Sequence, residues 1–185
     1  MDIIRESARI AIRNIKLTDV PQFVSWWNDG SLMSSVGFKH GLGITEEELM
    51  AEFREEITDT NPFRERRRYV VINRFSKIPI GELVYGSLDL GKKQCGLGIK
   101  ICEVSLQGMG LGQETLITFM NYLFEHFNLN RIEIDSIHDN IRALSLYKKL
   151  GFQEFNKKDN YSTDPEGIPH DLIFLGMDRK DWRYF

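Results

Sequence analysis

The sequence predicts an α+β domain with one twisted, mixed and mostly antiparallel sheet of about seven strands, flanked by helices. Two observations support this prediction. Several short strand-like segments before residue 102 are joined by tight turns, which is typical of antiparallel pairing. Residues 94–137 then follow the order strand, helix, strand, and a connection of that kind places its two strands parallel in one sheet.

Length and charge narrow the possible classes of protein. The 185 residues fit a single domain over 1–185 with a sizeable core. The chain has 24 basic and 27 acidic residues and a net charge of −3. This balance argues against general attraction to nucleic acid or to an anionic membrane. We therefore expect a small or protein substrate that is neutral or cationic.

The beginning of the chain carries no apolar run. Asp2 and Arg5 are charged, and no segment approaches the ~18 apolar residues of a membrane span. We expect a cytoplasmic protein that does not enter a membrane.

The two cysteines predict neither a disulfide nor a metal pair. Cys95 and Cys102 are seven residues apart on one predicted strand, so their side chains point to opposite faces. A core role for Cys102 is favoured over a nucleophilic one. The histidines show no ligand spacing with each other or with the cysteines, and we predict no metal site; they are His40, His126, His138 and His170.

The first elements follow from alternation and capping signals. Residues 9–15 alternate apolar and polar side chains as a strand does. Thr18, Asp19 and Pro21 then begin a helix that runs to Asn28. Gly30 to Ile44 is expected to be a loop, and a capping box at Thr45 opens a helix to Thr58.

Two adjacent tryptophans end the first helix. Trp26 and Trp27 are ~100° apart around the helix axis, so they cannot both face the core. Both are candidates to line a substrate pocket, with partial burial of the pair as the alternative.

The middle of the chain is a run of hairpin strands. Residues 69–72, 79–89 and 94–102 are predicted strands separated by tight turns. The basic run at residues 64–68 is interrupted by Glu65 in an acidic protein. It is interpreted as a solvated entrance to a strand rather than a nucleic-acid site.

The second half alternates helices and strands. Apolar spacing predicts a helix over 113–127 and a strand over 131–137. Asn140 and Gly151 are the start and stop signals of a further helix. The last strands are expected over 152–155 and 172–177, with a turn at Asp164 to Gly167.

The turn between the 94–102 strand and the 113–127 helix is rich in glycine. Its residues are Gln107, Gly108, Met109, Gly110, Leu111 and Gly112. Glycines permit backbone conformations that a side chain forbids and leave amides uncovered. Those amides lie at the positive end of the following helix, which predicts a phosphate site that needs no basic side chain.

The spacing of the glycines distinguishes among the known phosphate-binding loops. A nucleoside-triphosphate loop needs Gly-Lys-Ser or Gly-Lys-Thr, which the chain lacks here. A dinucleotide loop needs glycine where Gln113 stands. An ordinary turn from strand to helix remains the alternative.

The pattern from Gln107 through Gly110 to Gly112 resembles the acyl-CoA pyrophosphate loop of the GNAT family of N-acetyltransferases. A second segment resembles the family's other acyl-CoA motif; it comprises Asn140, Ala143, Tyr147 and Leu150-Gly151-Phe152. The likeness covers about residues 8–182. It extends to the branch with ribosomal-protein N-terminal and spermidine acetyltransferases, and it implies the GNAT (acyl-CoA N-acyltransferase) fold.

The resemblance implies transfer of acetyl from acetyl-CoA to a primary amine of a small molecule or a protein N-terminus. It makes Tyr147 the candidate general acid, with Glu82 or Glu103 as candidate base. Asn140 and Ala143 would contact the cofactor, although Asn140 could serve only as a helix cap and Tyr147 only as packing. Backbone groups of the strand end would bind the pantetheine and thioester; these residues are Ile101, Cys102, Glu103 and Val104.

The family makes a homodimer possible, and the segments expected to choose the acceptor are 30–44 and 156–169. A non-catalytic module that binds CoA or a nucleotide is the alternative function. An oxidoreductase is disfavoured by Gln113 and by the antiparallel strands upstream.

Overall fold

The computed structural model describes residues 3–185, so Met1 and Asp2, which entered the expectation about the start of the chain, lie outside it. Contacts within the chain divide it into two compact units, each described here by itself. The first comprises the residues up to Ile15, Asn61–Ile134 and Gly176–Phe185, and the second comprises Lys16–Thr60 and Asp135–Leu175.

The described strands form one mixed sheet in the order β1-β2-β3-β4-β5-β6-β8-β7. Pairing is antiparallel from β1 to β5 and parallel between β5 and β6, which confirms the predicted topology. The sheet has eight strands rather than about seven, because the N-terminal β1 was not predicted. The bounds are β1 Ile3–Glu6, β2 Ile10–Asn14, β3 Arg67–Asn73, β4 Pro79–Asp89, β5 Gln94–Ile101, β6 Arg131–Ile137, β7 Gln153–Thr163 and β8 Pro169–Asp178.

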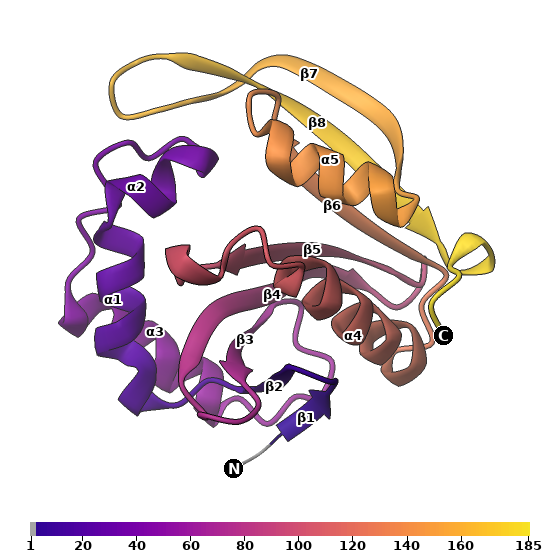
Figure 1. The fold of residues 1–185 in the computed structure, drawn as a ribbon, viewed down its shortest axis with the longest axis horizontal. Coiled ribbons are helices and arrows are strands. Elements are labelled where there is room, and N and C mark those ends of the chain that lie inside the picture. The colour runs from indigo at the N-terminus through magenta and orange to yellow at the C-terminus, as the bar shows by residue number, and fades with distance from the viewer. Residues whose placement is uncertain (1–2) are drawn as a thin grey trace. The chain divides into compact units, whose positions relative to one another are not determined.

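Helix α4 (Leu111–His126) packs on the strands of the first unit (Figure 1). Aromatic rings fill the space between them: the Tyr69 and Phe119 ring centroids are 5.0 Å apart, and those of Tyr85 and Phe127 are 5.2 Å apart. Tyr69, Tyr85 and Phe119 are each at most 2% exposed. Edge-on aromatic contacts of this kind add to the stabilisation from burial. The helix that follows the glycine loop is therefore anchored firmly.

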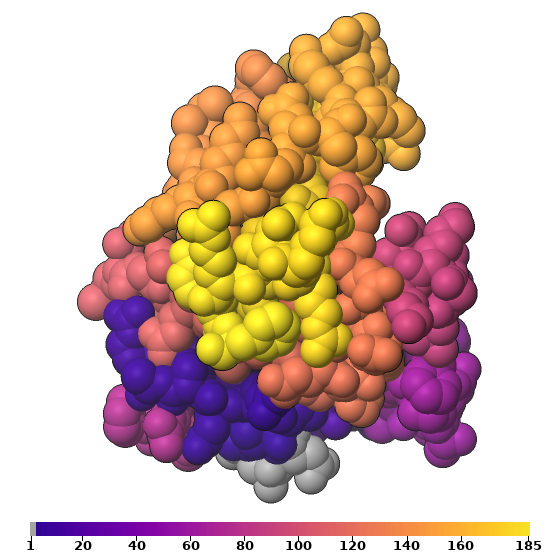
Figure 2. Space-filling view, turned by 90° about the vertical axis from the view of Figure 1, so that its right-hand side faces the viewer, coloured from indigo at the N-terminus to yellow at the C-terminus, as the bar shows by residue number. Residues whose placement is uncertain are grey.

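The C-terminal segment covers part of α4. In Figure 2 the last residues, in yellow, lie against coral-coloured atoms from the middle of the chain. The Trp182 indole packs on Phe124 with ring centroids 6.2 Å apart, and its Nε1 donates to Asn121 Oδ1 at 2.6 Å. Asn121 Nδ2 in turn donates to the Tyr184 carbonyl at 2.8 Å. A buried indole with its N–H satisfied is a stable anchor.

In the second unit α1 (Val20–Asn28) packs on α3 (Glu46–Thr58) through Phe23 and Phe53, whose ring centroids are 5.1 Å apart. The predicted capping box is confirmed: Thr45 Oγ1 accepts from the Glu48 amide at 3.2 Å, and Glu48 accepts from the Thr45 amide at 2.8 Å. Reciprocal bonds of this kind satisfy donors that a helix start leaves unpaired.

Two segments that were expected to be irregular are ordered. The 30–44 loop contains α2 (Gly30–Met33) and the 3-10 helix Ser34–Val36. Strand β7 extends to Thr163, far beyond the predicted end at residue 155. All of its residues are exposed, so no apolar alternation marks it. The predicted turn into β8 is confirmed, since the Gly167 amide donates to the Asp164 carbonyl at 2.9 Å.

Helix α5 (Ile141–Leu150) begins and ends where its signals predicted. Asn140 Oδ1 accepts from the Ala143 amide at 3.2 Å, and Gly151 ends the helix with a φ of 99°. A left-handed residue after a helix is the position that glycine fills without strain.

Across residues 3–185, no helix is both long enough and apolar enough to cross a membrane.

Candidate functional site

The glycine loop has the backbone that its sequence predicted at two of its three glycines. Gly108 and Gly110 adopt φ angles of 79° and 80°, in the left-handed region that other residues enter at a cost. Gly112 lies inside the first turn of α4, so its backbone is helical rather than left-handed. Residues 108–110 are exposed, and a Cβ placed on Gly108 would meet nothing within 4 Å. A ligand can therefore approach this backbone closely.

Gly110 is also the N-cap of α4, and it has no side chain with which to cap the helix. The first amides of a helix have no partner within the helix, and the helix dipole makes this end positive. The first bond of the helix runs from the Glu114 amide to the Gly110 carbonyl at 3.1 Å. The amides that precede Glu114 in the first turn are thus the donors suited to a phosphate.

The Gln107 side chain makes a hydrogen bond that the motif spacing did not predict. Its Nε2 donates to the Ile101 carbonyl at 2.7 Å, so the side chain turns back to the end of β5. The residue therefore fixes the loop to the strand, and its amide group is engaged before any ligand binds.

A basic side chain from elsewhere in the chain reaches the loop. Arg9, between β1 and β2, donates from Nη1 to the Met109 carbonyl at 2.9 Å and from Nε to Glu114 Oε2 at 2.6 Å. The prediction from sequence was a phosphate site that needs no basic side chain of its own, and it did not include Arg9. About 100 residues separate the partners, so no local pattern could reveal the contact.

The two residues that follow β5 have backbone amides that already donate hydrogen bonds within the protein. The Cys102 and Glu103 amides both donate to the Ile80 carbonyl, at 2.9 and 3.2 Å. The Cys102 side chain is 3% exposed, and burial is the main factor that raises the pKa of its thiol well above the usual range. A buried thiol that stays protonated is a poor nucleophile, so the core interpretation of Cys102 is the better one. Glu103 and Val104 are exposed.

Glu82 on β4 lies directly opposite Lys100 on β5. Lys100 Nζ is 3.1 Å from Glu82 Oε1, and each side chain is 16% exposed. The other candidate base, Glu103, is an exposed residue just beyond the strand. Of the two candidate bases, Glu82 is therefore the less exposed and the one that is held in an ion pair.

The second acyl-CoA motif lies in the second unit. Asn140 caps α5 through its side-chain oxygen, and its Nδ2 donates to the Ser35 carbonyl at 3.2 Å. Both ends of its amide are therefore engaged within the unit. Ala143 is half-buried one turn into the helix.

Tyr147 is 5% exposed in the same helix, and its ring centroid is 6.0 Å from that of Phe152. Burial, with the nearby negative charge of Asp135, raises the pKa of this hydroxyl above its usual value near 10. The group is thus held in its protonated form throughout the neutral range.

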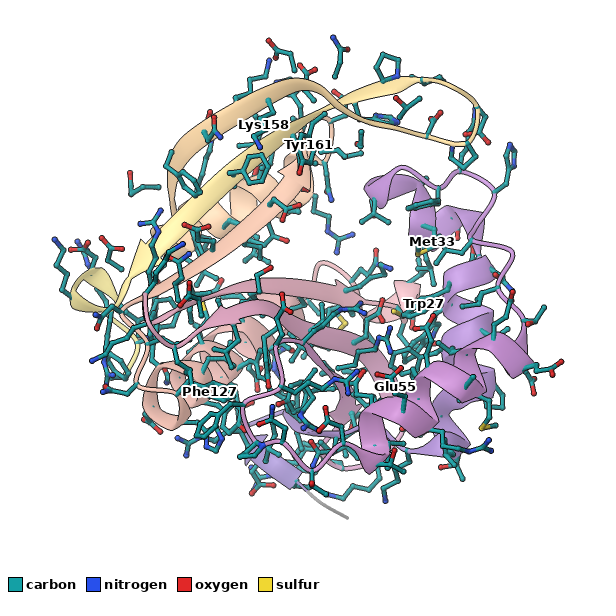
Figure 3. The ribbon with its side chains drawn as sticks, turned by 180° about the vertical axis from the view of Figure 1, so that it is seen from behind. Trp27, Met33, Glu55, Phe127, Lys158 and Tyr161 are labelled. Carbon is teal, nitrogen blue, oxygen red and sulfur yellow. The ribbon has the colours of Figure 1, made fainter. Side chains whose placement is uncertain are left out.

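The two tryptophans have different environments. Trp26 is 3% exposed and packs on Phe23 with ring centroids 5.3 Å apart, so it is a core side chain rather than a pocket residue. Trp27, labelled in Figure 3, is half-buried on α1. Of the pair, Trp27 alone remains a candidate for contact with a substrate.

The segments expected to choose the acceptor meet within the second unit. His40 Nε2 lies 3.3 Å from Glu166 Oε1, and a Cβ on Gly37 would lie 3.8 Å from the His170 ring. His170 Nε2 is 3.1 Å from Asp164 Oδ2. Strand β7 also carries the exposed side chain of Tyr161. Lys158 Nζ lies 4.7 Å from the centroid of its ring (Figure 3).

The predicted site residues thus fall in two sets. The glycine loop, the end of β5 and Glu82 belong to the first unit, and Asn140, Tyr147 and Trp27 belong to the second. Among residues 3–185, no three His, Cys, Asp or Glu side chains are grouped to hold a metal ion.

Comparison with known proteins identifies the family. Residues 9–153 match the family model described as an acetyltransferase (GNAT) domain. The chain belongs to the GNAT family.

Relatives of this GNAT chain share limited sequence. A putative ribosomal N-acetyltransferase of Bacillus subtilis (strain 168) is 25% identical over 146 residues, which cover 70% of this chain and 76% of that protein. An N-acetyltransferase 9-like protein of Nematostella vectensis is 39% identical over 61 residues. That match covers 33% of this chain and only 31% of the relative.

Solved structures share the fold. A spermidine N-acetyltransferase from Vibrio cholerae in complex with CoA and spermine has a TM-score of 0.83 at 20% identity. The match covers 95% of this chain and 98% of that one. A GNAT-family acetyltransferase from Bacillus anthracis has a TM-score of 0.78 at 17% identity, with 97% and 99% coverage. The chain therefore has the GNAT fold that its motifs implied.

The left-handed backbone at Gly110 gives a direct test of the loop. Gly110→Ala should lower the free energy of unfolding by about 1–2 kcal/mol, because a side chain is strained at this φ. Gly112→Ala is the matched control: at its helical position alanine should be neutral or stabilising by up to about 1 kcal/mol. Chemical denaturation of both variants measures the difference. Equal effects of the two substitutions would contradict the assigned loop conformation.

Proposed function

We propose that this chain transfers the acetyl group of acetyl-CoA to a primary amine by direct attack. The observation that carries the proposal is the exposed loop of Gly108 and Gly110, with left-handed backbone, at the uncapped start of α4. In a member of the GNAT family, this is where the diphosphate of CoA would bind, on backbone amides at the positive end of a helix.

The reaction requires a neutral amine with a free lone pair, a thioester carbonyl for it to attack, and a proton for the departing sulfur. The amine nitrogen attacks the carbonyl carbon and forms the C–N bond, giving a tetrahedral intermediate. Its collapse breaks the C–S bond and releases CoA. A base removes one proton from the nitrogen, and the sulfur receives one from an acid or from water.

We assign the base role to Glu82. Its carboxylate is held beside Lys100 Nζ at 3.1 Å and has restricted access to solvent. This carboxylate can accept a proton from the amine directly or through one water. Lys100 is on β5, which is the strand that leads to the glycine loop.

We assign the acid role to Tyr147, whose side chain is 5% exposed and whose hydroxyl keeps its proton in the neutral range. A thiol has a pKa of about 8.5, which is below that of tyrosine, so full transfer to a free thiolate is uphill. Burial increases that difference. The hydroxyl therefore acts by donating a hydrogen bond to the sulfur as the C–S bond lengthens, with proton transfer late in that step.

The acceptor is a primary amine on a small molecule or a protein N-terminus. A spermidine acetyltransferase shares the fold, and a putative ribosomal N-acetyltransferase shares sequence, so amines of both kinds are the substrates to screen. Trp27 and the segments 30–44 and 156–169 are the candidate contacts for the acceptor. Acetyl-CoA is the cosubstrate, and the proposed reaction uses no metal.

Tyr147→Phe tests the acid. The substitution keeps the ring and removes only the hydroxyl, so kcat should fall about 100-fold or more while the dissociation constant of acetyl-CoA stays within about twofold. Thiol release in a screen of amines gives kcat, and calorimetry gives the affinity. Tyr184→Phe, at an exposed tyrosine near the C-terminus and outside the segments proposed to contact the acceptor, is the control and should behave as the unchanged chain. Full activity in Tyr147→Phe would remove Tyr147 from the acid role.

Glu82→Gln and Glu103→Gln distinguish the two candidate bases. Glu82→Gln should lower kcat/KM about 100-fold, because the attacking nitrogen then loses the group that takes its proton. Glu103→Gln should change kcat/KM less than about threefold, because its exposed carboxylate is dispensable in this mechanism. A pH profile of kcat/KM for each variant provides the comparison. The reverse pattern would assign the base to Glu103.

A further inference from the structure

The turn between β1 and β2 is bonded to the start of α4 by an ionic cluster. Glu114, in the first turn of the helix, accepts from Ser7 Oγ at 2.7 Å, from the Arg9 amide at 2.7 Å and from Arg9 Nε at 2.6 Å. The Glu114 side chain is 16% exposed and the Arg9 side chain 46%, so solvent screens part of this ion pair on the Arg9 side.

The same guanidinium also holds the loop backbone. Arg9 Nη1 donates to the carbonyl of Met109, the residue between the two left-handed glycines. Because a trans peptide directs its C=O and the next N–H to opposite sides, this bond turns the Gly110 amide away from Arg9. One side chain thus sets the orientation of a peptide unit in the middle of the loop.

The ion pair of Arg9 and Glu114 also determines the charge at the start of α4. Partial burial works to raise the pKa of the Glu114 carboxyl, but hydrogen bonds from Ser7 and Arg9 outweigh it and hold the pKa below its usual range. Glu114 is therefore negative at neutral pH. An unpaired carboxylate here would repel a phosphate at the same helix end, and Arg9 cancels that charge.

We propose that Arg9 is a positioning residue for the diphosphate of CoA. It orients the Met109–Gly110 peptide and neutralises Glu114, so that the amides at the start of α4 can accept the anion. The inference rests on the proposed function, since it concerns the CoA site of that reaction.

Arg9→Met tests the role with a matched control in the same turn. Arg74 donates from Nη1 to the Ser7 carbonyl at 2.8 Å and pairs with Glu6 at 3.2 Å, so it supports the same turn without an interaction with the loop. By calorimetry, Arg9→Met should weaken CoA binding about tenfold or more. Arg74→Met should stay within about twofold of the unchanged chain.

Two further readouts separate positioning from general structural support. Adding Glu114→Gln to Arg9→Met should restore part of the lost affinity, because the uncompensated charge is gone. S-acetylpantetheine lacks the diphosphate, so kcat/KM with it should be the same for Arg9→Met and the unchanged chain. An unaltered CoA affinity in Arg9→Met, no restoration in the double variant, or an equal loss with S-acetylpantetheine would each overturn the inference.

The outcome for the unchanged chain distinguishes this inference from the proposed function. If the unchanged chain binds no CoA, the proposed function fails and the role of Arg9 fails with it. If it binds CoA and Arg9→Met binds equally well, only the role of Arg9 fails.

Discussion

The start of α4 is the constraint on which the candidate site depends. The chain passes from β5 into a buried helix through residues with left-handed backbone, and Gly110 supplies no side chain to cap that helix. Capping groups normally satisfy such amides, and a helix end without a cap has donors left for a ligand. Aromatic packing of α4 on the sheet, through Tyr69 and Phe119, keeps the end in place. The binding capacity of the loop is thus a consequence of how the core holds the helix.

Burial has opposite consequences for two groups that could take part in chemistry. It raises the pKa values of both the Cys102 thiol and the Tyr147 hydroxyl. A cysteine must lose its proton to be a nucleophile, so burial makes Cys102 inert. A hydrogen-bond donor must keep its proton, so burial suits the proposed role of Tyr147. The same physical effect therefore removes one candidate and supports the other.

Local signals predicted the parts of the fold that are set by nearby residues. The caps at Thr45, Asn140 and Gly151 were correct, because a capping bond joins residues three or four apart. The two glycine positions with left-handed backbone followed from the same kind of local requirement. Family motifs then identified the fold, although the sequence identity with solved relatives is near 20%.

The sequence did not predict features that depend on contacts between distant residues, or the full extent of strands whose side chains are exposed to solvent. Strand β1 is only four residues long, and β7 is exposed along its whole length, so neither shows an apolar period. The bond from Gln107 to Ile101 and the contact of Arg9 with the loop both depend on how segments meet in space. Trp26 and Trp27 were separable only once the packing of α1 on α3 was known.

The most direct test of the account is thermal unfolding of the purified chain with and without acetyl-CoA, with NADH and ATP as controls. Ligand at about 100 times its dissociation constant should stabilise the fold by about 2.7 kcal/mol. For a chain of this length that raises the Tm by about 5 °C or more. A rise with acetyl-CoA that neither control reproduces is the predicted result. No rise at millimolar acetyl-CoA, or a larger one with NADH, would contradict the assignment of the glycine loop as an acyl-CoA site.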